Sequence, residues 1–577
     1  MNNVFINIAG SNANRYGNKI AYIELKGNNE VKSIKYSSLH AEIIKLGEKL
    51  LECKLTGKVF ILYFPAGIDS IIVFMACFYA GVIPILRTYP PNLNLDVERL
   101  KFQLDSILKE VNQVAGIIST TNIIKIIRRC FDKNIIYNIN IDNLGGICIV
   151  QFSDNHSKTY IFNTNFIQLT SGSTNASRGV KISFKNLLYN IRSCKRLWDV
   201  DSNSITVTWT PHSHIFGLIT GILLPLYTGG TSVIMQPSDF SKDPLLWIEN
   251  ISNYRATHSG APNFAYEMCT FHYSESRMQN IELKSWQVAI TGGEIDKEVT
   301  LNNFCAKFQK HGFNLNKFCT SYGMSENSGV VCSVKKSNIL RRCVANRQEF
   351  IANRIREVKI KNENSLIFLS VGKPSYGTEI IIANLITLEP LPENEIGEIL
   401  INSPSLSEGY VNDLDNYKQY VDMNINGIYR KFFRTGDIGF MRLGYLFITG
   451  RTKEIIIING KNYSPNDIEE NAKKVIMSKI LGLNAAFSVE INNNEVVILF
   501  QEVNEVVSIK LLTEIQKQIK EKIKLILNIE LYDIVFLKKG DIVLTPSGKI
   551  QRMECKRQYL DKTKFAYLSS QHIKTIN

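Results

Sequence analysis

Short apolar runs alternate with amphipathic stretches through most of the chain. Residues 59–64 are apolar at every position and predict a buried strand, and residues 69–79 predict the helix that follows it. A further helix is expected over 244–254, and further strands are expected over 116–118, 166–169, 204–209, 231–235 and 287–290. Strands that alternate with helices assemble as layered, largely parallel sheets, so the pattern predicts an α/β fold.

The pattern of charged and apolar residues changes near residue 450. A charged segment at 450–454 precedes the apolar run 455–458, and residues 464–467 are typical of a helix start. We therefore predict a large N-terminal α/β body of several subdomains over 1–450, and a small, mobile C-terminal α/β lobe over 451–577. A helix over 509–526 and a strand over 531–536 are expected within this lobe.

Composition indicates an ordinary folded protein. Hydrophobic residues make up 45% of the chain and charged residues 21%, close to globular averages. The net charge is +14, but the Lys and Arg residues are scattered rather than clustered. We therefore expect no nucleic-acid partner, although the charge would steer a phosphorylated substrate or an acidic carrier protein toward the molecule.

Cysteine usage and hydropathy favour a cytoplasmic protein. The eleven cysteines are dispersed without Cys-x-x-Cys pairs, which does not suit a closed set of disulfides. The most apolar early run, residues 71–86, is too short for a spanning helix and contains Gly81 and Pro84. We expect no integral membrane segment.

Residues 170–179, Thr-Ser-Gly-Ser-Thr-Asn-Ala-Ser-Arg-Gly, follow a predicted strand and are rich in hydroxyls and glycine. Glycines let the backbone approach a polyphosphate closely, and N–H groups, hydroxyls and Arg178 can donate to its oxygens. The loop lacks the Gly-Lys-[Ser/Thr] of a Walker loop and the spacing of a dinucleotide fingerprint. Taken alone, such a cluster is also compatible with an ordinary surface turn.

Four later stretches carry compatible chemistry. Gly292 and Gly293 precede Glu294 after a strand, and residues 320–326 combine an aromatic ring, hydroxyls and a carboxylate. Residues 434–437 are expected to place the Asp437 carboxylate in a tight turn, where it could accept hydrogen bonds from two ribose hydroxyls. The stretch Pro-Ser-Gly-Lys at 546–549 places a single cation on a loop near the end of the chain.

Together with the loop at 170–179, these stretches resemble, in order and separation, the adenylate-forming (acyl-activating) enzyme superfamily. The resemblance implies ATP as a substrate and magnesium as a cofactor, with Glu326 as the metal ligand. It implies that Lys549 bridges the carboxylate and the α-phosphate, that Tyr322 stacks on adenine, and that Lys453 is the hinge. The implied nucleotide-binding residues are Thr170, Ser171, Gly172, Ser173, Thr174, Arg178, Gly179, Gly292, Gly293, Glu294, Ser321, Tyr322, Gly323, Ser325, Asp437 and Arg451.

Each residue also has a purely structural interpretation. Tyr322 is compatible with a core aromatic, Glu326 with a helix N-terminal charge, Asp437 with a turn former and Lys549 with a solvated lysine. His214 is implied as a catalytic residue that closes the acyl pocket, and it is equally compatible with a satisfied histidine beneath the sheet. Only the joint pattern favours the functional roles.

Within the superfamily the chain is most similar to fatty acyl-AMP ligases. The residues that carry this likeness include 78–82, 254–266 and 434–440, together with extra sequence at about 333–370, where that branch has an insertion. The resemblance implies activation of a fatty or related carboxylic acid to acyl-AMP, with release of pyrophosphate. The acyl group would then pass to the phosphopantetheine thiol of a separate acyl carrier protein.

Two alternatives remain open. Ile215 and Phe216 stand where the branch usually has Asp and Met, and His-Ile-Phe-Gly is more similar to ordinary acyl-CoA synthetases. The acceptor is therefore either a carrier protein or CoA. A non-catalytic adenylate-binding protein is disfavoured because Glu326, Asp437 and Lys549 are all present. Acyl chain length has no local signal, since a binding tunnel is lined by residues distant in sequence.

Overall fold

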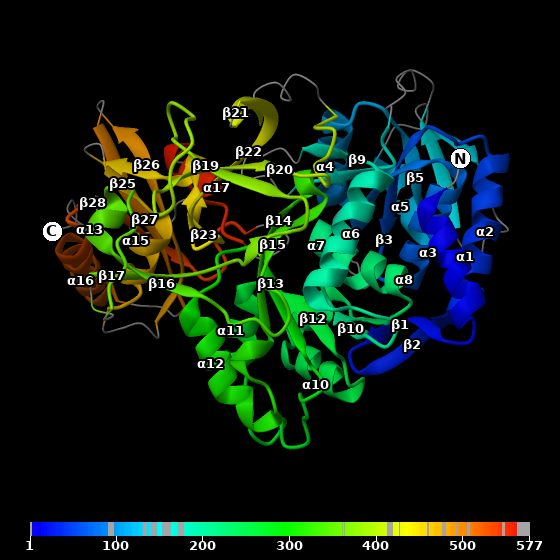
Figure 1. The fold of residues 1–577 in the computed structure, drawn as a ribbon, viewed down its shortest axis with the longest axis horizontal. Coiled ribbons are helices and arrows are strands. Elements are labelled where there is room, and N and C mark those ends of the chain that lie inside the picture. Colours follow the sequence, from blue (N-terminus) through cyan, green and yellow to red (C-terminus); the bar gives the residue numbers. More distant parts are fainter. Residues whose placement is uncertain are drawn as a thin grey trace.

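The computed structural model describes residues 3–89, 97–130, 136–139, 147–152, 163–170, 178–359, 362, 364–411, 419–425, 427–458, 461–475, 480–491, 494–504, 508–544 and 549–561. Two large sheets form the centre of the molecule (Figure 1). The first has nine strands in the order β18-β15-β14-β13-β12-β10-β11-β1-β2, and the second has seven strands in the order β6-β7-β5-β3-β4-β8-β9.

The nine-stranded sheet is parallel at its centre, from β14 to β1, and antiparallel at both edges. Its strands are β1 (Ile20–Lys26), β2 (Asn29–Lys35), β10 (Ile205–Thr208), β11 (Thr231–Ile234), β12 (His258–Ala261), β13 (Val288–Gly292), β14 (Phe318–Met324), β15 (Gly329–Ser333) and β18 (Lys373–Pro374).

The seven-stranded sheet is likewise mixed. Its strands are β3 (Val59–Phe64), β4 (Ile83–Thr88), β5 (Val114–Thr120), β6 (Ile136–Ile139), β7 (Ile147–Phe152), β8 (Phe166–Leu169) and β9 (Gly179–Ile182). Strand β3 is buried at all six positions because neighbouring strands and helical layers enclose it.

Helices fill the space between the two sheets and cover both outer faces. The shared core between the sheets includes side chains of α1 (Val4–Tyr16), α2 (Tyr36–Glu52), α3 (Ile68–Ala80), α6 (Phe184–Trp198), α7 (Ile215–Gly217) and α8 (Leu224–Thr228). Helices α4 (Val97–Glu110) and α5 (Thr121–Cys130) cover the seven-stranded sheet, and α9 (Pro237–Lys242), α10 (Leu245–Asn253), α11 (Asn263–Phe271) and α12 (Glu298–Phe308) cover the nine-stranded sheet. The result is a layered α/β body, and the predicted fold class is confirmed.

Helix α3 illustrates how sequence and layering agree. Almost all its residues are buried, because it lies between the two sheets and has no solvent-facing side. It ends at Gly81, whose φ of 69° is left-handed and disfavours residues with a side chain. Predicted strands 59–64 and 166–169 match β3 and β8 exactly, and predicted helix 244–254 is α10.

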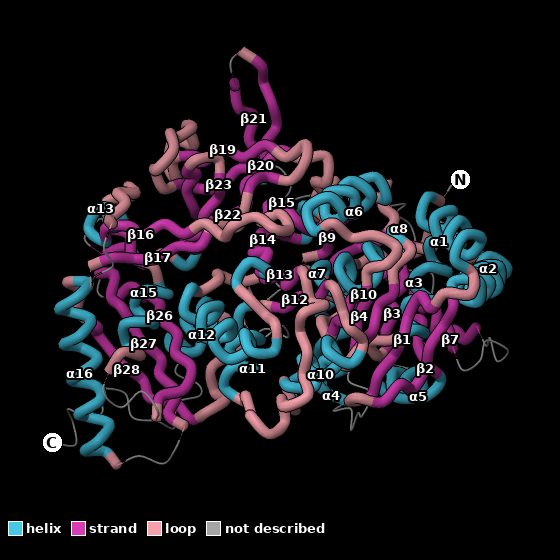
Figure 2. The backbone as a smooth tube through the Cα atoms, turned by 60° about the horizontal axis from the view of Figure 1, so that its bottom comes forward, coloured by secondary structure: helices cyan, strands magenta, loops and turns pink. Residues whose placement is uncertain are grey.

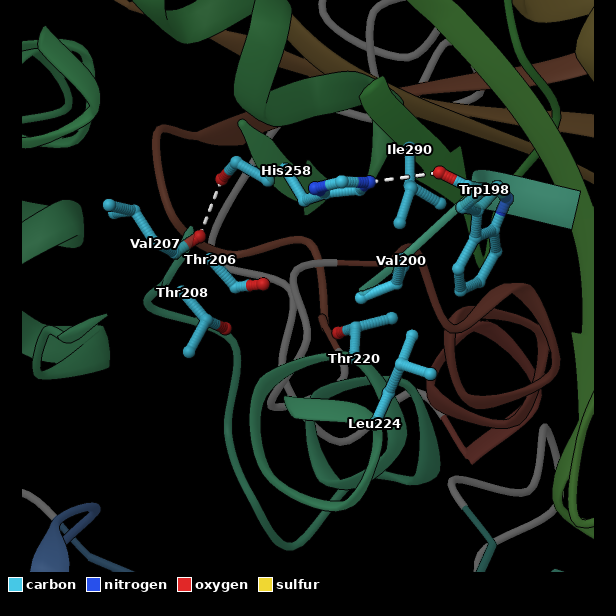
Figure 3. Close-up of a pocket in the computed structure, with 11 residues that line it drawn as sticks. Trp198, Val200, Thr206, Val207, Thr208, Thr220, Leu224, His258 and Ile290 are labelled. Carbon is cyan, nitrogen blue, oxygen red and sulfur yellow. Dashed lines mark hydrogen bonds between the residues drawn. The ribbon is translucent and has the colours of Figure 1, made fainter. Parts of the chain in front are cut away.

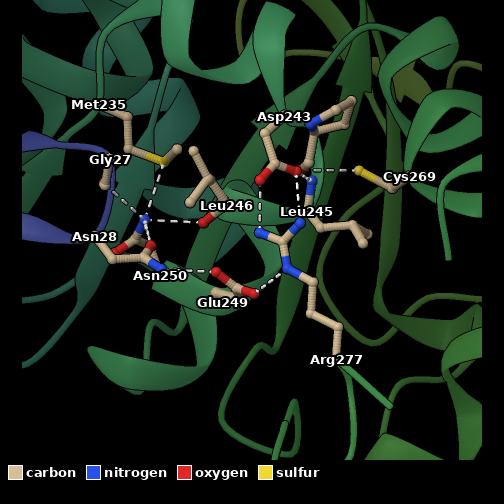
Figure 4. A network of polar contacts seen from close by, with 11 residues as sticks. Gly27, Asn28, Met235, Asp243, Leu245, Leu246, Glu249, Asn250, Cys269 and Arg277 are labelled. Carbon is tan, nitrogen blue, oxygen red and sulfur yellow. Dashed lines mark hydrogen bonds and ion pairs between the residues drawn. The ribbon is translucent and has the colours of Figure 1, made fainter. Parts of the chain in front are cut away.

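A polar network fixes α10 against the N-terminal hairpin (Figure 4). The Asn250 side-chain amide donates to Asn28 Oδ1 at 2.9 Å and to Gly27 O at 3.3 Å. On the same helix, Glu249 Oε1 lies 2.5 Å from Arg277 Nε, whose guanidinium also pairs with Asp243. The Asn250 contacts connect segments about 220 residues apart in sequence, and the Arg277 contacts connect α10 with a segment about 30 residues later.

A smaller sheet and a hairpin lie between the body and the C-terminal elements. The sheet comprises β19 (Glu379–Ala383), β20 (Gly397–Asn402), β21 (Tyr420–Ile425), β22 (Ile428–Arg442) and β23 (Tyr445–Arg451), and the tip of its β21–β22 hairpin projects from the body (Figure 2). The hairpin of β16 (Arg342–Asn346) and β17 (Ser365–Leu369), with α13 (Arg347–Ile351) between them, falls within the predicted insertion.

The C-terminal elements have a core of their own. They are β24 (Ile456–Ile458), β25 (Lys461–Tyr463), α15 (Pro465–Ala472), β26 (Leu481–Ile491), β27 (Asn494–Val503), α16 (Ile509–Leu527), β28 (Leu531–Lys538) and α17 (Arg552–Asp561). The insertion hairpin touches them, because Arg347 forms a buried ion pair with Asp467 of α15. The boundary at 450/451 coincides with the last residue of β23 and stays a prediction, as do the bounds of the insertion.

Candidate active site

The predicted site residues converge near the carboxyl end of β13. This strand ends at Gly292, and Gly293 has a left-handed φ of 89°. A methyl group placed on Gly293 would lie 3.5 Å from Lys549 Nζ, so the lysine of the C-terminal elements reaches the edge of the central sheet. The structure thus brings Lys549 next to Gly292 and Gly293, which lie more than 250 residues earlier in the chain.

The environment of Lys549 is mixed in charge. Burial, followed by the positive charge of Arg451, lowers the pKa of Lys549 to about 8, while Glu294, Asp437 and Glu454 oppose this shift. These electrostatic effects place Lys549 among the residues predicted to bind nucleotide. Near neutral pH the lysine is mostly protonated and can stabilise an anion.

Asp437 and Tyr322 form a direct pair. The Tyr322 hydroxyl donates to Asp437 Oδ2 at 2.6 Å, and Arg451 Nε lies 3.0 Å from Asp437 Oδ1. The expected tight turn is wrong: Asp437 lies within strand β22, paired with Arg451 of β23. A carboxylate has about four acceptor positions, so Asp437 retains capacity for hydroxyl donors after these two contacts.

The two ends of the predicted phosphate-binding loop, residues 170–179, which we call the phosphate loop, are well defined. The Thr170 N–H donates to Arg178 O at 2.9 Å, and the Arg178 N–H donates to Thr170 Oγ1 at 3.1 Å, which closes the loop where β8 meets β9. Gly179 N–H donates to Glu110 Oε1 at 3.1 Å. The predicted phosphate ligands within the loop, Ser171, Gly172, Ser173 and Thr174, lie outside the described residues, as do Pro546, Ser547 and Gly548 beside Lys549.

Tyr410 connects Arg178 with Glu326. The Arg178 guanidinium lies 5.0 Å from the centre of the Tyr410 ring, and the Tyr410 hydroxyl donates to Glu326 Oε1 at 2.8 Å. Burial raises the pKa of Glu326, whereas this hydrogen bond opposes the rise. The sequence analysis missed Tyr410, because it is 84 residues from Glu326 and no local pattern marks the contact.

Three other predicted residues have clear structural contacts. The Ser321 hydroxyl lies 2.8 Å from the Ser333 hydroxyl of the adjacent strand, and a side chain on Gly323 would meet Gly329 O at 2.6 Å. Ser325 is buried in the short turn after β14. These contacts explain the residue types by strand packing, and a direct role in nucleotide binding stays a prediction for all three.

Glu294 and His214 flank Lys549. Glu294 Oε1 accepts a hydrogen bond from the Phe264 N–H at 2.6 Å, and burial raises its pKa. His214 Nδ1 accepts from the Phe216 N–H at 3.2 Å, so in the neutral ring the proton is on Nε2. Burial, then the charge of Lys549, lowers the pKa of His214 to about 3. His214 is therefore a neutral hydrogen-bond donor near the lysine.

Beside these polar groups lies a cavity of about 240 Å³, which we call the apolar cavity. His214, Gly292, Gly293 and Lys549 line its polar end, and its other walls include Trp209, Phe216, Phe240, Phe264 and Met268. The sequence analysis read residues 204–209 only as a strand and did not single out Phe240 or Met268. Their side chains come from the residue after β10, from α9 and from α11, so only the tertiary structure could group them.

The described part of the chain contains no helix that is both long and apolar enough to cross a membrane. It also contains no group of three or more His, Cys, Asp or Glu side chains placed to hold a metal ion without other ligands.

Comparisons with known proteins identify the family of this chain. A family model described as "AMP-binding enzyme" matches residues 10–411. The medium-chain-fatty-acid–[acyl-carrier-protein] ligase JamA of Moorena producens is 32% identical over 550 residues, which cover 93% of this chain and 91% of that protein.

Two solved structures are similar over nearly the whole chain. A fatty acid AMP ligase from Legionella pneumophila has 27% identity and a TM-score of 0.70, with 98% of this chain and 97% of that chain covered. A structure from a study of fatty acyl-adenylate ligases from E. coli and L. pneumophila has a TM-score of 0.82 at 23% identity, with 97% and 98% covered, and supports the fold. The predicted adenylate-forming assignment is confirmed: the chain is an enzyme of the AMP-binding family.

Proposed function

We propose that this chain uses ATP to convert a fatty or related carboxylic acid to acyl-AMP, with release of pyrophosphate. It then transfers the acyl group to the phosphopantetheine thiol of a separate acyl carrier protein. The observation that carries the proposal is the position of Lys549, between the apolar cavity and the predicted nucleotide residues. The ligase activity named for JamA and the Legionella enzyme supports this choice of substrate.

The chemistry requires a carboxylate to attack the α-phosphorus of ATP, so an anion approaches an anion. Protonated Lys549 lowers this repulsion and positions the two reactants. His214 Nε2–H can donate to the carboxylate or to the α-phosphate. The new bond joins a carboxylate oxygen to the α-phosphorus, and the bond to the β-phosphate oxygen breaks, so pyrophosphate leaves with its electron pair.

The nucleotide contacts follow from the polar groups already described. Arg178 and the phosphate loop would bind the β- and γ-phosphates, and Asp437 would accept from the ribose hydroxyls. Tyr322 is proposed to pack on adenine, although its hydroxyl is committed to Asp437. Gly292, Gly293 and Glu294 would line the edge of the base.

Glu326 fits a magnesium site that is completed by substrate. Mg²⁺ is usually bound through one or two carboxylates together with phosphate oxygens, and Glu326 is a carboxylate near one end of the phosphate loop. When bound, the ion neutralises charge on the leaving phosphates.

The second half-reaction needs space for a thiol where Lys549 now lies. We infer that the lobe 451–577 rotates about Lys453, which is in the short turn Thr452–Glu454 after β23. Movement of the lobe would withdraw Lys549 and admit the phosphopantetheine arm. The protein is proposed to work in the cytoplasm, where its dispersed cysteines would remain reduced.

The decisive experiment separates activation from acceptor choice. The enzyme is incubated with ATP, Mg²⁺ and a panel of fatty acids, and acid-dependent exchange of pyrophosphate into ATP is measured. Next, CoA or a phosphopantetheinylated carrier is added to the acyl-AMP, and acyl transfer is followed by mass spectrometry. We expect exchange with fatty acids and transfer to the carrier.

Two outcomes would redirect the assignment. Efficient formation of acyl-CoA would establish the acyl-CoA synthetase alternative, which His214 to Gly217 favour by their sequence. Absence of exchange across the whole acid panel, in a protein that still binds ATP, would instead establish a non-catalytic adenylate-binding protein.

A further inference from the structure

Phe216 lies between the apolar cavity and residues that line a second, much smaller cavity. Its ring lines the apolar cavity and packs over two glycines: a side chain on Gly260 would meet Phe216 Cζ at 3.0 Å, and one on Gly292 would meet its Cε2 at 3.8 Å. Gly260 and Ile290 in turn line the smaller cavity. The ring therefore contacts the apolar cavity on one side and packs against the wall of the smaller cavity on the other.

The smaller cavity, called the inner cavity, has a volume of only about 10 Å³. Thr206, Thr208, Thr220 and His258 contribute to its wall (Figure 3). The rest of its wall is largely apolar and includes Trp198, Val207 and Leu224, and a volume of this size corresponds to about one water molecule. The inner cavity cannot accept an acyl chain while Phe216 stays in place.

Aromatic rings form much of the remaining wall of the apolar cavity. Trp209 and Phe240 stack with ring centres 3.8 Å apart and planes 2° from parallel, and Phe264 packs edge-on to both at 6.3 and 6.4 Å. Trp209 and Phe240 are buried and also pack against Trp247 of α10. Protein interiors are close-packed, so these rings cannot move aside without disturbing several neighbours.

The polar end of the cavity fixes the direction of the substrate. Lys549, Gly293 and His214 lie at this end, where the proposed function places the carboxylate. The hydrocarbon then extends along the apolar walls, which include Phe216, Trp209 and Phe240. Burial of hydrocarbon against apolar walls is favourable, whereas entry to the inner cavity would require displacement of a ring and contact with hydroxyl groups.

We propose that Phe216 and the Trp209–Phe240 stack make this enzyme selective for acids of medium chain length or comparable bulk, and that Phe216 sets the limit. A cavity of 150 Å³ accommodates benzene, so 240 Å³ provides space for about ten carbon atoms, the carboxyl carbon included. The inference rests on the proposed function, because it takes the apolar cavity as the acyl site. Phe216 is thus a specificity-determining residue.

The test compares linear acids from four to sixteen carbons by pyrophosphate exchange. For the unaltered enzyme we expect the highest kcat/KM at six to ten carbons, and values at least roughly tenfold lower at fourteen and sixteen, because extra methylenes overfill the cavity. Phe216→Ala joins the two cavities and should raise the preferred length by about two to six carbons, since the deleted ring occupied the space of benzene.

Phe184→Ala is the matched control. Phe184 is another half-buried phenylalanine that packs against the same core as Phe216, but it does not line the apolar cavity. This variant should retain the original length profile even if its stability falls. Phe216→Leu serves as the second variant if Phe216→Ala does not fold, and it should produce a smaller shift in the same direction.

Equal use of sixteen-carbon and eight-carbon acids by the unaltered enzyme would overturn the proposal, as would an unchanged profile in both Phe216 variants. If no acid supports exchange, the proposed function fails instead. Binding of unreactive acyl-sulfamoyl adenosines by calorimetry then still tests the cavity. Tighter binding of the eight-carbon than the sixteen-carbon compound supports the size limit, and the reverse order refutes it.

Discussion

The two sides of the candidate active site are built on opposite principles. On the polar side, charged groups hold one another in place: Asp437 contacts both Tyr322 and Arg451, and Tyr410 connects Arg178 with Glu326. In the apolar cavity, aromatic rings define shape by packing and make few polar contacts. Lys549 stands where the two sides meet.

This difference predicts how each side responds to mutation. Loss of a charge on the polar side removes stabilisation of developing negative charge, so it lowers the rate for every acid alike. A change of volume in the cavity alters which acid fits and leaves the phosphate chemistry intact. Three changes on the polar side test this difference between the two sides. Each should alter activity by the same factor for acids of every chain length.

The largest effect is expected for Lys549→Ala. Removal of one preorganised cation should lower the rate of acyl-AMP formation by about 10²- to 10³-fold for short and long acids equally. Transfer from supplied acyl-AMP to the carrier should continue, because Lys549 is proposed to leave the site before that step. Each half-reaction is measured separately by mass spectrometry.

Lys510→Ala, which alters an exposed lysine on α16, is the control and should leave both half-reactions unchanged. An equal fall of both half-reactions in a well-folded Lys549→Ala protein would contradict the division of labour between them.

A smaller effect is expected from alkaline pH. Burial and Arg451 lower the pKa of Lys549 to about 8, and the protonated form is the active one. The kcat/KM of acyl-AMP formation, which reports the free enzyme, should therefore fall about tenfold per pH unit well above pH 8. Stability changes in the opposite direction to activity. Between pH 8 and the higher pKa that Lys549 has in the unfolded chain, the unfolded chain binds more protons than the folded protein. The contribution of Lys549 to the free energy of unfolding therefore rises over this range.

Lys549→Arg provides the comparison, since a guanidinium stays protonated throughout this range. Where this variant retains measurable activity, its alkaline decline should be absent. A decline at the same pH in both proteins would assign it to another group.

The smallest effect is expected for Tyr322→Phe. The change removes the hydrogen bond to Asp437 but keeps the ring and leaves the Arg451 contact in place. The loss should be about 1.5 kcal/mol, roughly a tenfold rise in KM for ATP with kcat nearly unchanged. Steady-state kinetics at saturating acid measures the KM for ATP. A change in acid preference would contradict the proposed separation between nucleotide binding and acid selection.

Much of the fold could be predicted because its signals are local. An all-apolar run such as 59–64 predicts a buried strand whatever its neighbours, and it is β3. The C-terminal helix over 509–526 was marked by its 3.6-residue period and is α16, Ile509–Leu527. The Arg434 to Asp437 stretch misled the prediction: its Thr-Gly-Asp composition suits a turn, but the flanking apolar residues pair with β20 and keep it in a strand.

The sequence by itself determined the fold class and the family of this protein: the α/β pattern, the glycine- and hydroxyl-rich loop and the short stretches with Glu326, Asp437 and Lys549 together predicted an adenylate-forming enzyme. These features are short stretches whose residue types are constrained one by one. The tertiary structure alone decided that Tyr410 reaches Glu326, that Lys549 reaches Gly293, and that Phe216 lines one cavity with Trp209, Phe240 and Met268. Packing brings together residues far apart in the chain, and the volume that they enclose depends on all of them at once.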